Sequence, residues 1–214
     1  MKNNYLDLLK ASIFAGIAIS IGCLAFLTMG AIIGPILFTF GLITVVHYKL
    51  SLYTGSVGFV DLLGTTKSHK ENWQRILIII FGNMVGCLIV ALLATQGNFT
   101  FALNATAIIN SRLSQSLLAV LVRGIGCGLI MTTAVQFARE GKFLPLLFGV
   151  PLFIYCGFYH SIADTFYYIF GISDKLTYLM SNINIALRMM LYLGITYVGN
   201  YFGCSAYKLF VSDK

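Results

Sequence analysis

Two polar side chains lie deep inside apolar stretches of this chain, and both suit proton exchange or hydrogen bonding to a small solute. His160 stands between GFY and SIADTF, and Thr54 follows SLY within an apolar run that extends from residue 31 to residue 62. Imidazole changes charge near neutral pH, and ionisable groups at membrane depth mark pathways by default. The alternatives are that His160 is a satisfied core group and that Thr54 caps a helix.

The other reactive side chains form no familiar catalytic or metal-binding motif. Asp164 follows His160 by four residues, but there is no HExxH motif, second ligand cluster or pair of catalytic carboxylates. The cysteines are small hydrophobic residues in this interpretation, because all lie in apolar stretches and none forms a CxxC pair. They are Cys23, Cys87, Cys127, Cys156 and Cys204. We expect no metal, no cofactor and no enzymatic activity.

The composition indicates a protein that crosses a membrane several times. Of the 214 residues, 58% are hydrophobic and only 10% are charged, against about 25% charged residues in soluble domains. At about 20 residues per crossing, the chain has room for about six spans. Large extramembrane domains are therefore excluded, together with any nucleotide-driven pump that carries its own motor. Nucleic acid is not needed to explain the net charge of +7, because the basic residues lie mostly between apolar runs.

The apolar runs and the flanking charges predict an orientation. The runs are 10–29, 31–62, 75–95, 115–137, 143–171 and 184–210, and the third and fourth are joined by an expected outside loop. One side of the membrane would carry Lys2, Lys10, Lys67, Lys70, Arg75, Arg139, Lys142, Lys208 and Lys214, and the other only Arg112 and Lys175. The positive-inside rule then places both termini in the cytoplasm of a multi-pass plasma (inner) membrane protein.

The second and fifth runs are unusually long and carry polar residues at mid-run, which predicts two broken spans. Irregular backbone at bilayer depth is tolerated only where it is buried in protein or lines a cavity. Asn83 lies in GNMVGC of the third run, and Asn200 lies in the similar GNYFGC of the sixth. We therefore expect an all-α membrane protein of six transmembrane helices. These form two inverted three-helix repeats, about 10–95 and 115–210, in a single channel domain over 1–214.

Several motifs resemble those of the formate/nitrite transporter family, which includes formate, nitrite and hydrosulfide channels. GFYHSIADTF resembles the family's GFEHSIANMF, and LYTG resembles its LFTG loop. NWQRILIIIFGNMVGC resembles the NW...FGNxxG third span, and RGIGCGL resembles RGILCNW in the fourth. The similarity runs through nearly the whole chain.

The resemblance implies an aquaporin-like homopentamer with one pore in each protomer, embedded in membrane lipid. It places His160 opposite Thr54 at the pore centre. It implies a cytoplasmic-side constriction of Leu42, Leu52 and Tyr53, an outer constriction of Phe38 and Phe153, and an outer vestibule with the basic Arg112.

The chain departs from the family pattern at positions that bear on the substrate. The acids that usually precede LFTG and HSIA are Ser51 and Tyr159 here. The asparagine after HSIA is Asp164, the asparagine of the fourth span is Gly128, and Lys49 stands where the family usually has glycine. We therefore expect this protein to differ from the formate channels of the family in its substrate or its gating.

The resulting hypothesis is a channel or transporter for small weak-acid anions and protons, in which His160 supplies or stabilises the proton. Lys49, Arg112 and Arg123 would attract anions at the mouths. Arg123 is also open to a structural role at backbone carbonyls, and Asp164 to capping a helix, contacting substrate or pairing with a cation such as Arg188. A pore for neutral small solutes is the alternative function.

Overall fold

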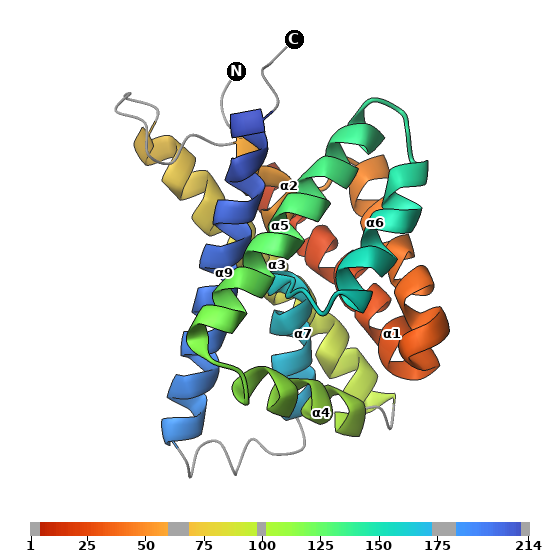
Figure 1. Ribbon diagram of the computed structural model, residues 1–214, viewed down its shortest axis with the longest axis vertical. Coiled ribbons are helices and arrows are strands. Elements are labelled where there is room, and N and C mark those ends of the chain that lie inside the picture. Colours follow the sequence, from red (N-terminus) through yellow and green to blue (C-terminus); the bar gives the residue numbers. More distant parts are fainter. Residues whose placement is uncertain (1–4, 60–68, 98–101, 173–182, 211–214) are drawn as a thin grey trace.

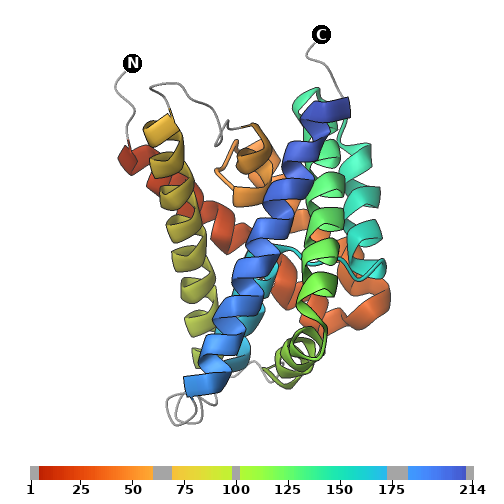
Figure 2. The same cartoon turned by 60° about the vertical axis from the view of Figure 1, so that its left-hand side comes forward.

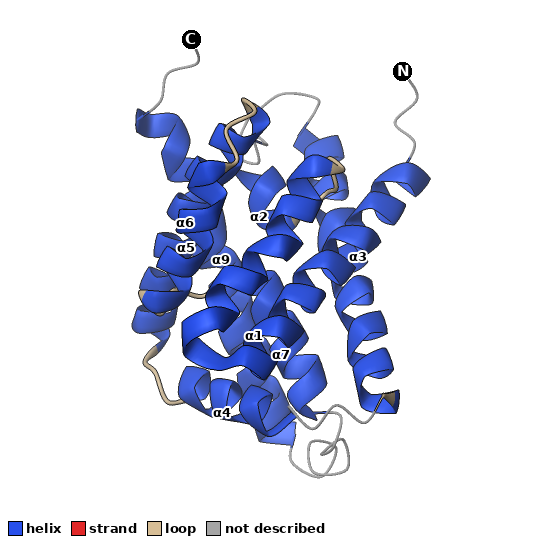
Figure 3. Ribbon diagram, turned by 90° about the vertical axis from the view of Figure 1, so that its right-hand side faces the viewer, coloured by secondary structure: helices blue, strands red, loops and turns tan. Residues whose placement is uncertain are grey.

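The computed structural model describes residues 5–59, 69–97, 102–172 and 183–210, and every regular element in those ranges is a helix (Figure 3). The helices are α1 (Tyr5–His47), α2 (Tyr53–Ser56), α3 (His69–Gln96), α4 (Ala102–Leu113), α5 (Leu117–Arg139), α6 (Leu144–Tyr155), α7 (Ser161–Ile172) and α9 (Ile183–Phe210), with a 3₁₀ turn at Val57–Phe59. The expected all-α class is confirmed. Four of the lysines that were used to predict the orientation lie outside the described residues: Lys2, Lys67, Lys175 and Lys214.

Helix α1 contains two membrane-length segments. Its 43 residues would extend about 65 Å if straight, roughly twice the thickness of the hydrocarbon core. The chain instead turns back at Gly30, whose φ of 69° lies in the left-handed region, so that the two segments run in opposite directions (Figure 1). This turn falls between the first two predicted apolar runs.

The described helices have the length and surface of an integral membrane protein. Three described segments, Tyr5–His47, Lys70–Gln96 and Leu117–Arg139, are long and apolar enough to cross a bilayer. Large apolar side chains remain exposed around the bundle, as at Ile32 and Leu118, which is the surface that lipid or a neighbouring subunit would cover. Helix α1 begins and α9 ends at the same end of the bundle (Figure 1), which we call the termini end.

Two pairs of long helices form the frame of the molecule. Helix α3 packs along α1, and α9 packs along α5 (Figures 1 and 2). A side chain at Gly86 would overlap the carbonyl of Ile13, and one at Gly203 would overlap the carbonyl of Ile125. Glycine at these two positions therefore allows each pair of backbones to approach closely.

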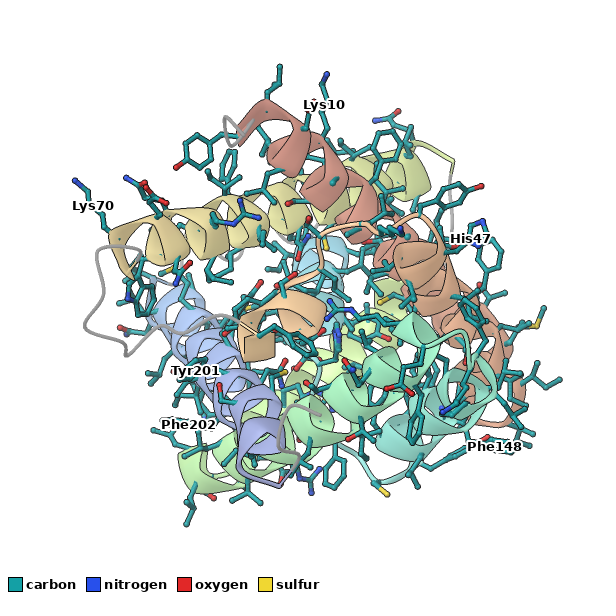
Figure 4. All side chains as sticks on the ribbon, turned by 90° about the horizontal axis from the view of Figure 1, so that it is seen from above. Lys10, His47, Lys70, Phe148, Tyr201 and Phe202 are labelled. Atoms are coloured by element: carbon teal, nitrogen blue, oxygen red, sulfur yellow. The ribbon has the colours of Figure 1, made fainter. Side chains whose placement is uncertain are left out.

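The segment between the third and fourth runs is a helix and not the loop that the sequence predicted. Helix α4 lies across the end of the bundle opposite the termini (Figure 1). It packs against α7, and the Asn104 side chain donates to the carbonyl of Leu27 at 2.9 Å. The short helix α2 lies near the middle of the bundle seen from the termini end, where Lys10 and Lys70 lie at the rim (Figure 4).

Candidate functional site

The second predicted run loses its helical conformation between α1 and α2. The amide of Lys49 donates to the carbonyl of Val46 at 3.1 Å, and the amide of Leu50 donates to that of Val45 at 2.9 Å. This pair of bonds is the Schellman motif, whose C′ residue adopts the left-handed conformation usually given to glycine. Lys49 has a φ of 52°. The helix end therefore holds a lysine in a conformation that costs a residue with a Cβ about 1–2 kcal/mol.

The fifth run is interrupted by the same motif between α6 and α7. The amide of Gly157 donates to the carbonyl of Ile154 at 3.0 Å, and that of Phe158 donates to the carbonyl of Phe153 at 2.9 Å. Gly157 takes the C′ position with a φ of 68°, which glycine adopts without strain. Both interruptions thus end a helix in the same way and release the backbone toward the middle of the bundle.

Asn83 of α3 holds the first interruption. Its Nδ2 donates to the carbonyl of Ser12 at 2.8 Å and to that of Ser51 at 3.0 Å, and its Oδ1 accepts from the amide of Tyr53 at 3.0 Å. Asn83 is fully buried. One side chain therefore satisfies backbone groups on both sides of Leu52, which would otherwise be unpaired in an apolar interior.

Asn200 of α9 holds the second interruption in the matching way. Its Nδ2 donates to the carbonyl of Gly124 at 2.9 Å and to that of Tyr159 at 2.8 Å, and its Oδ1 accepts from the amide of Ser161 at 2.8 Å. The two repeated GNxxGC motifs therefore carry equivalent asparagines, and the residue held between the clamped groups is Leu52 in one case and His160 in the other.

The cysteines of the same two motifs reach across to the opposite interruption. Cys204 Sγ donates to the carbonyl of Thr54 at 3.2 Å, and Cys87 Sγ donates to the carbonyl of Ile162 at 3.6 Å. Both residues are fully buried and unpaired as thiols. They are small buried side chains, as the sequence indicated, but each also supplies a weak donor to a helix start.

His160 and Thr54 are in direct contact at the centre of this arrangement. Thr54 Oγ1 lies 2.9 Å from His160 Nε2, and the amide of Ala163 donates to His160 Nδ1 at 3.2 Å. Because Nδ1 accepts a hydrogen bond, the proton of the neutral ring resides on Nε2, from which it donates to the threonine oxygen. His160 therefore caps the start of α7 with one nitrogen and binds Thr54 with the other.

A cavity of about 490 Å³ opens on the termini end of this centre. Leu42 and Leu52 form part of its wall, and Lys49, His47 and Arg139 supply its polar side chains. We call it the termini-side vestibule. Arg139 was counted in the sequence only as a topology signal, yet its Nη2 donates to the carbonyl of Gly55 in α2 at 2.8 Å.

A smaller cavity of about 130 Å³ lies on the other side of the centre and reaches α4. Phe38, Phe153 and His160 line it, together with Arg112 and Asp164. We call it the far-side vestibule. The rings of Phe38 and Phe153 meet edge to face with centroids 6.0 Å apart, and Phe153 lies at the same distance from the His160 ring.

Tyr53 takes a different position from the two leucines with which the resemblance grouped it. Its hydroxyl donates to the carbonyl of Tyr197 at 3.0 Å, and the two rings pack with centroids 4.9 Å apart. It does not line the termini-side vestibule, whereas Leu42 and Leu52 do. The Tyr53 side chain therefore joins α2 to α9.

The charged residues near the far-side vestibule pair differently from the arrangement considered for the sequence. Asp164 contacts Arg112, with Nε 3.3 Å from Oδ1, while Arg188 donates to the carbonyl of Leu113 at 2.7 Å. Asp164 thus pairs with a cation, as one of the sequence alternatives had it, but the cation is Arg112 and not the suggested Arg188. Helix α4 brings Arg112 beside α7. The sequence predicted a loop for this segment, so the position of Arg112 could not be foreseen.

Arg123 binds the second interruption from α5. Its Nη1 donates to the carbonyl of Gly157 at 3.4 Å and to the hydroxyl of Tyr159 at 3.2 Å. These contacts are those of a residue that holds the backbone in place. Among the described residues, no three metal-binding side chains of the kind histidine, cysteine, aspartate or glutamate come together.

A helical membrane bundle with two interrupted segments at its middle and vestibules toward both ends has the architecture of a transporter or channel. The family model for the formate/nitrite transporters matches residues 1–211. The chain therefore belongs to the formate/nitrite transporter family, whose members are channels and transporters and not enzymes.

Relatives and solved structures agree with this assignment. The chain is 28% identical to the nitrite transporter NirC of Salmonella typhimurium over 180 residues, covering 76% of this chain and 67% of that protein. It is 27% identical to the formate channel FocA of Escherichia coli over 187 residues, covering 75% and 65%. A pentameric formate channel with formate bound is similar with a TM-score of 0.82, 25% identity and coverage of 97% of this chain and 95% of that one.

Proposed function

We propose that this protein conducts small monovalent weak-acid anions, such as formate, nitrite or hydrosulfide, through a pore in each protomer. The observation that carries the proposal is the contact of Thr54 Oγ1 with His160 Nε2 between the two vestibules. Leu42 and Leu52 on one side, and Phe38 and Phe153 on the other, are the proposed constrictions. Family membership and the similarity to formate and nitrite proteins support the substrate class.

The apolar constrictions favour passage of the substrate in its protonated form. Removing water from an ion at a site of low dielectric constant costs on the order of several kcal/mol per ion, even after the protein relaxes. Protonating an acid with a pKa of about 4 costs roughly 1.36 kcal/mol per pH unit, and hence about 4 kcal/mol at neutral pH. The neutral acid then passes the apolar residues without a charge to desolvate.

The hydrogen bonds of His160 indicate what the residue contributes to the proposed pathway. Its Nδ1 accepts from the amide of Ala163, so a second ring proton would break this bond and place a positive charge at the positive end of α7. In this proposal His160 therefore stays a neutral ring that orients the Thr54 hydroxyl and carries no proton to the substrate. The Nε2–H of His160 donates to the oxygen of Thr54. The hydroxyl proton of Thr54 is then free to donate to the substrate.

In this proposal the protein consists of two inverted three-helix repeats, about 10–95 and 115–210. Helices α1 and α3 belong to the first repeat, and α5 and α9 belong to the second. The matching clamps of Asn83 and Asn200 support this symmetry. We place both termini in the cytoplasm of the inner membrane, on the basic residues of the termini end, and propose a homopentamer on the likeness to a pentameric formate channel.

The test is a flux assay in proteoliposomes with the wild-type protein and His160→Asn. Asparagine is a good helix N-cap, so it replaces the bond to Ala163 but removes the ring that contacts Thr54. Formate, nitrite, hydrosulfide and lactate are compared at a mildly acidic and a neutral pH. We expect the variant to lose most of its flux, while the remaining flux still rises toward acidic pH because the substrate itself is protonated there. An unchanged flux would remove His160 from the mechanism.

The same vesicles distinguish the alternative function. Swelling with urea or glycerol, without formate or nitrite flux, would identify a pore for neutral solutes. Such a result would contradict the proposed anion pathway while leaving the family assignment intact.

A further inference from the structure

The far-side vestibule contains a carboxylate with one oxygen engaged and the other open. Asp164 is only 2% exposed, and its Oδ1 accepts from Arg112 Nε at 3.3 Å. Its Oδ2 is buried without a hydrogen-bond partner among the described residues. A buried charged acceptor without a partner is costly. The structure thus has an acceptor that a small donor molecule in the adjoining cavity would satisfy.

Arg112 is held in place beside this acceptor. Its guanidinium lies over the ring of Tyr159, with Cζ 3.8 Å from the centroid, and its only hydrogen bond to a described residue is the one from Nε to Asp164. The two Nη groups therefore remain as donors. The Tyr159 ring is itself fixed by Arg123 through the bond to its hydroxyl.

The pair offers one acceptor and several donors with no net charge. Phe38, Phe153 and His160 line the same cavity of about 130 Å³, so its occupant is small and partly surrounded by apolar rings. A protonated weak acid carries an O–H or S–H donor for Asp164 Oδ2, and its remaining oxygen or sulfur can accept from Arg112. A free anion would meet Arg112 but would be repelled by the carboxylate next to it.

The termini-side vestibule differs in charge. Lys49 and Arg139 line it together with His47, and no carboxylate is among the described residues of its wall. That vestibule attracts anions, whereas the charge of Arg112 in the far-side vestibule is balanced by Asp164. The two mouths of the pathway therefore select different forms of the same substrate.

We propose that Arg112 and Asp164 form a selectivity site that binds the neutral, protonated weak acid in the far-side vestibule and disfavours permanently ionised anions. This inference rests on the proposed function and specifies the substrate form that the far-side mouth accepts. Asp164 is the determining residue, because the family asparagine would leave the charge of Arg112 uncompensated.

The test compares nitrate with formate in proteoliposomes at one neutral pH, with substrate supplied from the far side. Nitrate is small, planar and ionised at this pH, and formate has an accessible protonated form. We expect Asp164→Asn, which keeps the shape of the side chain, to raise the nitrate-to-formate flux ratio at least about tenfold, because a unit charge acts strongly at short range in a weakly screened site. Glu140→Gln is the matched control, because it removes a carboxylate from an exposed pair with Lys142 and should leave the ratio unchanged.

A second variant covers the case in which Asp164→Asn does not fold. The double variant Arg112→Gln, Asp164→Asn removes both charges and should restore a ratio near that of the wild type, and Arg112→Gln alone should lower the ratio. If Asp164→Asn does not fold, Arg112→Gln alone decides. A flux ratio within about twofold of the wild type in every one of these single variants that folds would overturn the inference. Absence of formate flux in wild-type vesicles would instead overturn the proposed function, so the two failures are distinguishable.

Discussion

The two interruptions share one backbone frame but present different side chains. Each begins with a Schellman motif, passes between the carbonyl and amide clamped by a buried asparagine, and continues into a short helix. Lys49 corresponds to Gly157, and Leu52 corresponds to His160. The first segment therefore supplies an apolar residue where the second supplies an imidazole.

This difference shows how a symmetric frame can hold an asymmetric site. The clamps set the position of the central residue in each half, and the type of that residue decides whether it adds an apolar side chain or a hydrogen-bond donor. Leu52 makes no side-chain cap at the start of α2, whereas His160 caps α7 and binds Thr54. The imidazole at the centre of the molecule therefore comes from the second half.

The strongest test of the shared frame is removal of each asparagine. Asn83→Ala and Asn200→Ala should each lower the free energy of unfolding by about 3–5 kcal/mol, since three backbone groups lose their partner in each case. Thermal denaturation of the detergent-solubilised protein, followed by circular dichroism, measures the loss. Asn110→Ala, at an exposed position of α4, should stay within about 0.5 kcal/mol of the wild type. A large loss in only one of the two variants would show that the halves are not equivalent.

The next test addresses the side chain that meets the imidazole. Thr54→Val keeps the shape but removes the oxygen that accepts from His160, so the buried Nε2–H is left unpaired. We expect a loss of about 1–3 kcal/mol in unfolding free energy and a sharp fall in formate flux. Thr54→Ser restores the hydroxyl and should recover most of both. Wild-type flux in the valine variant would mean that this hydroxyl takes no part in transport.

A smaller effect is expected at the glycine of the second Schellman motif. Gly157→Ala forces a Cβ into the left-handed region and should cost about 1–2 kcal/mol; this Cβ would also lie 3.3 Å from Arg123 Nη1. Gly194→Ala in α9 is the control, because nothing lies within 4 Å of its added Cβ. The control should be neutral or stabilising in the same denaturation assay. Equal effects at the two glycines would contradict the argument from backbone conformation.

The smallest change is expected at Lys49, where the sign is reversed. Lys49→Gly relieves the backbone strain but adds flexibility to the unfolded chain, so we expect a net stabilisation of less than about 1 kcal/mol. Anion flux from the termini side should fall because the vestibule loses a cation, most clearly at low salt. Lys49→Ala should lower the flux without adding stability. A stable Lys49→Gly protein with undiminished flux would show that the strained lysine serves no electrostatic purpose.

The sequence predicted those parts of the fold that depend on hydrophobicity and on repeated motifs. The apolar runs indicated the helical membrane class and the boundary near Gly30, and the repeated GNxxGC motif singled out Asn83 and Asn200. The proximity of Thr54 and His160 came from the resemblance to a family. No local pattern could have placed two residues so far apart in the chain within 2.9 Å.

The sequence did not predict features that depend on how elements meet. Helix α4 was missed because its segment is short and only weakly apolar, and without it Arg112 could not be assigned to Asp164. The orientation of Tyr53 toward Tyr197 depends on the packing of α2 against α9. Arg139 lacked a signal because its distant acceptor, the carbonyl of Gly55, is set by tertiary structure.

The glycine contacts at Gly86 and Gly203 have a consequence for turnover. Because the paired helices touch backbone to backbone there, the two helices of each pair have no room to shift against each other within a repeat. We expect each helix pair to stay rigid while solutes cross. Within each pair, the motions left to the pathway are rotamer changes of the side chains that line it and the loss of hydration water at each mouth.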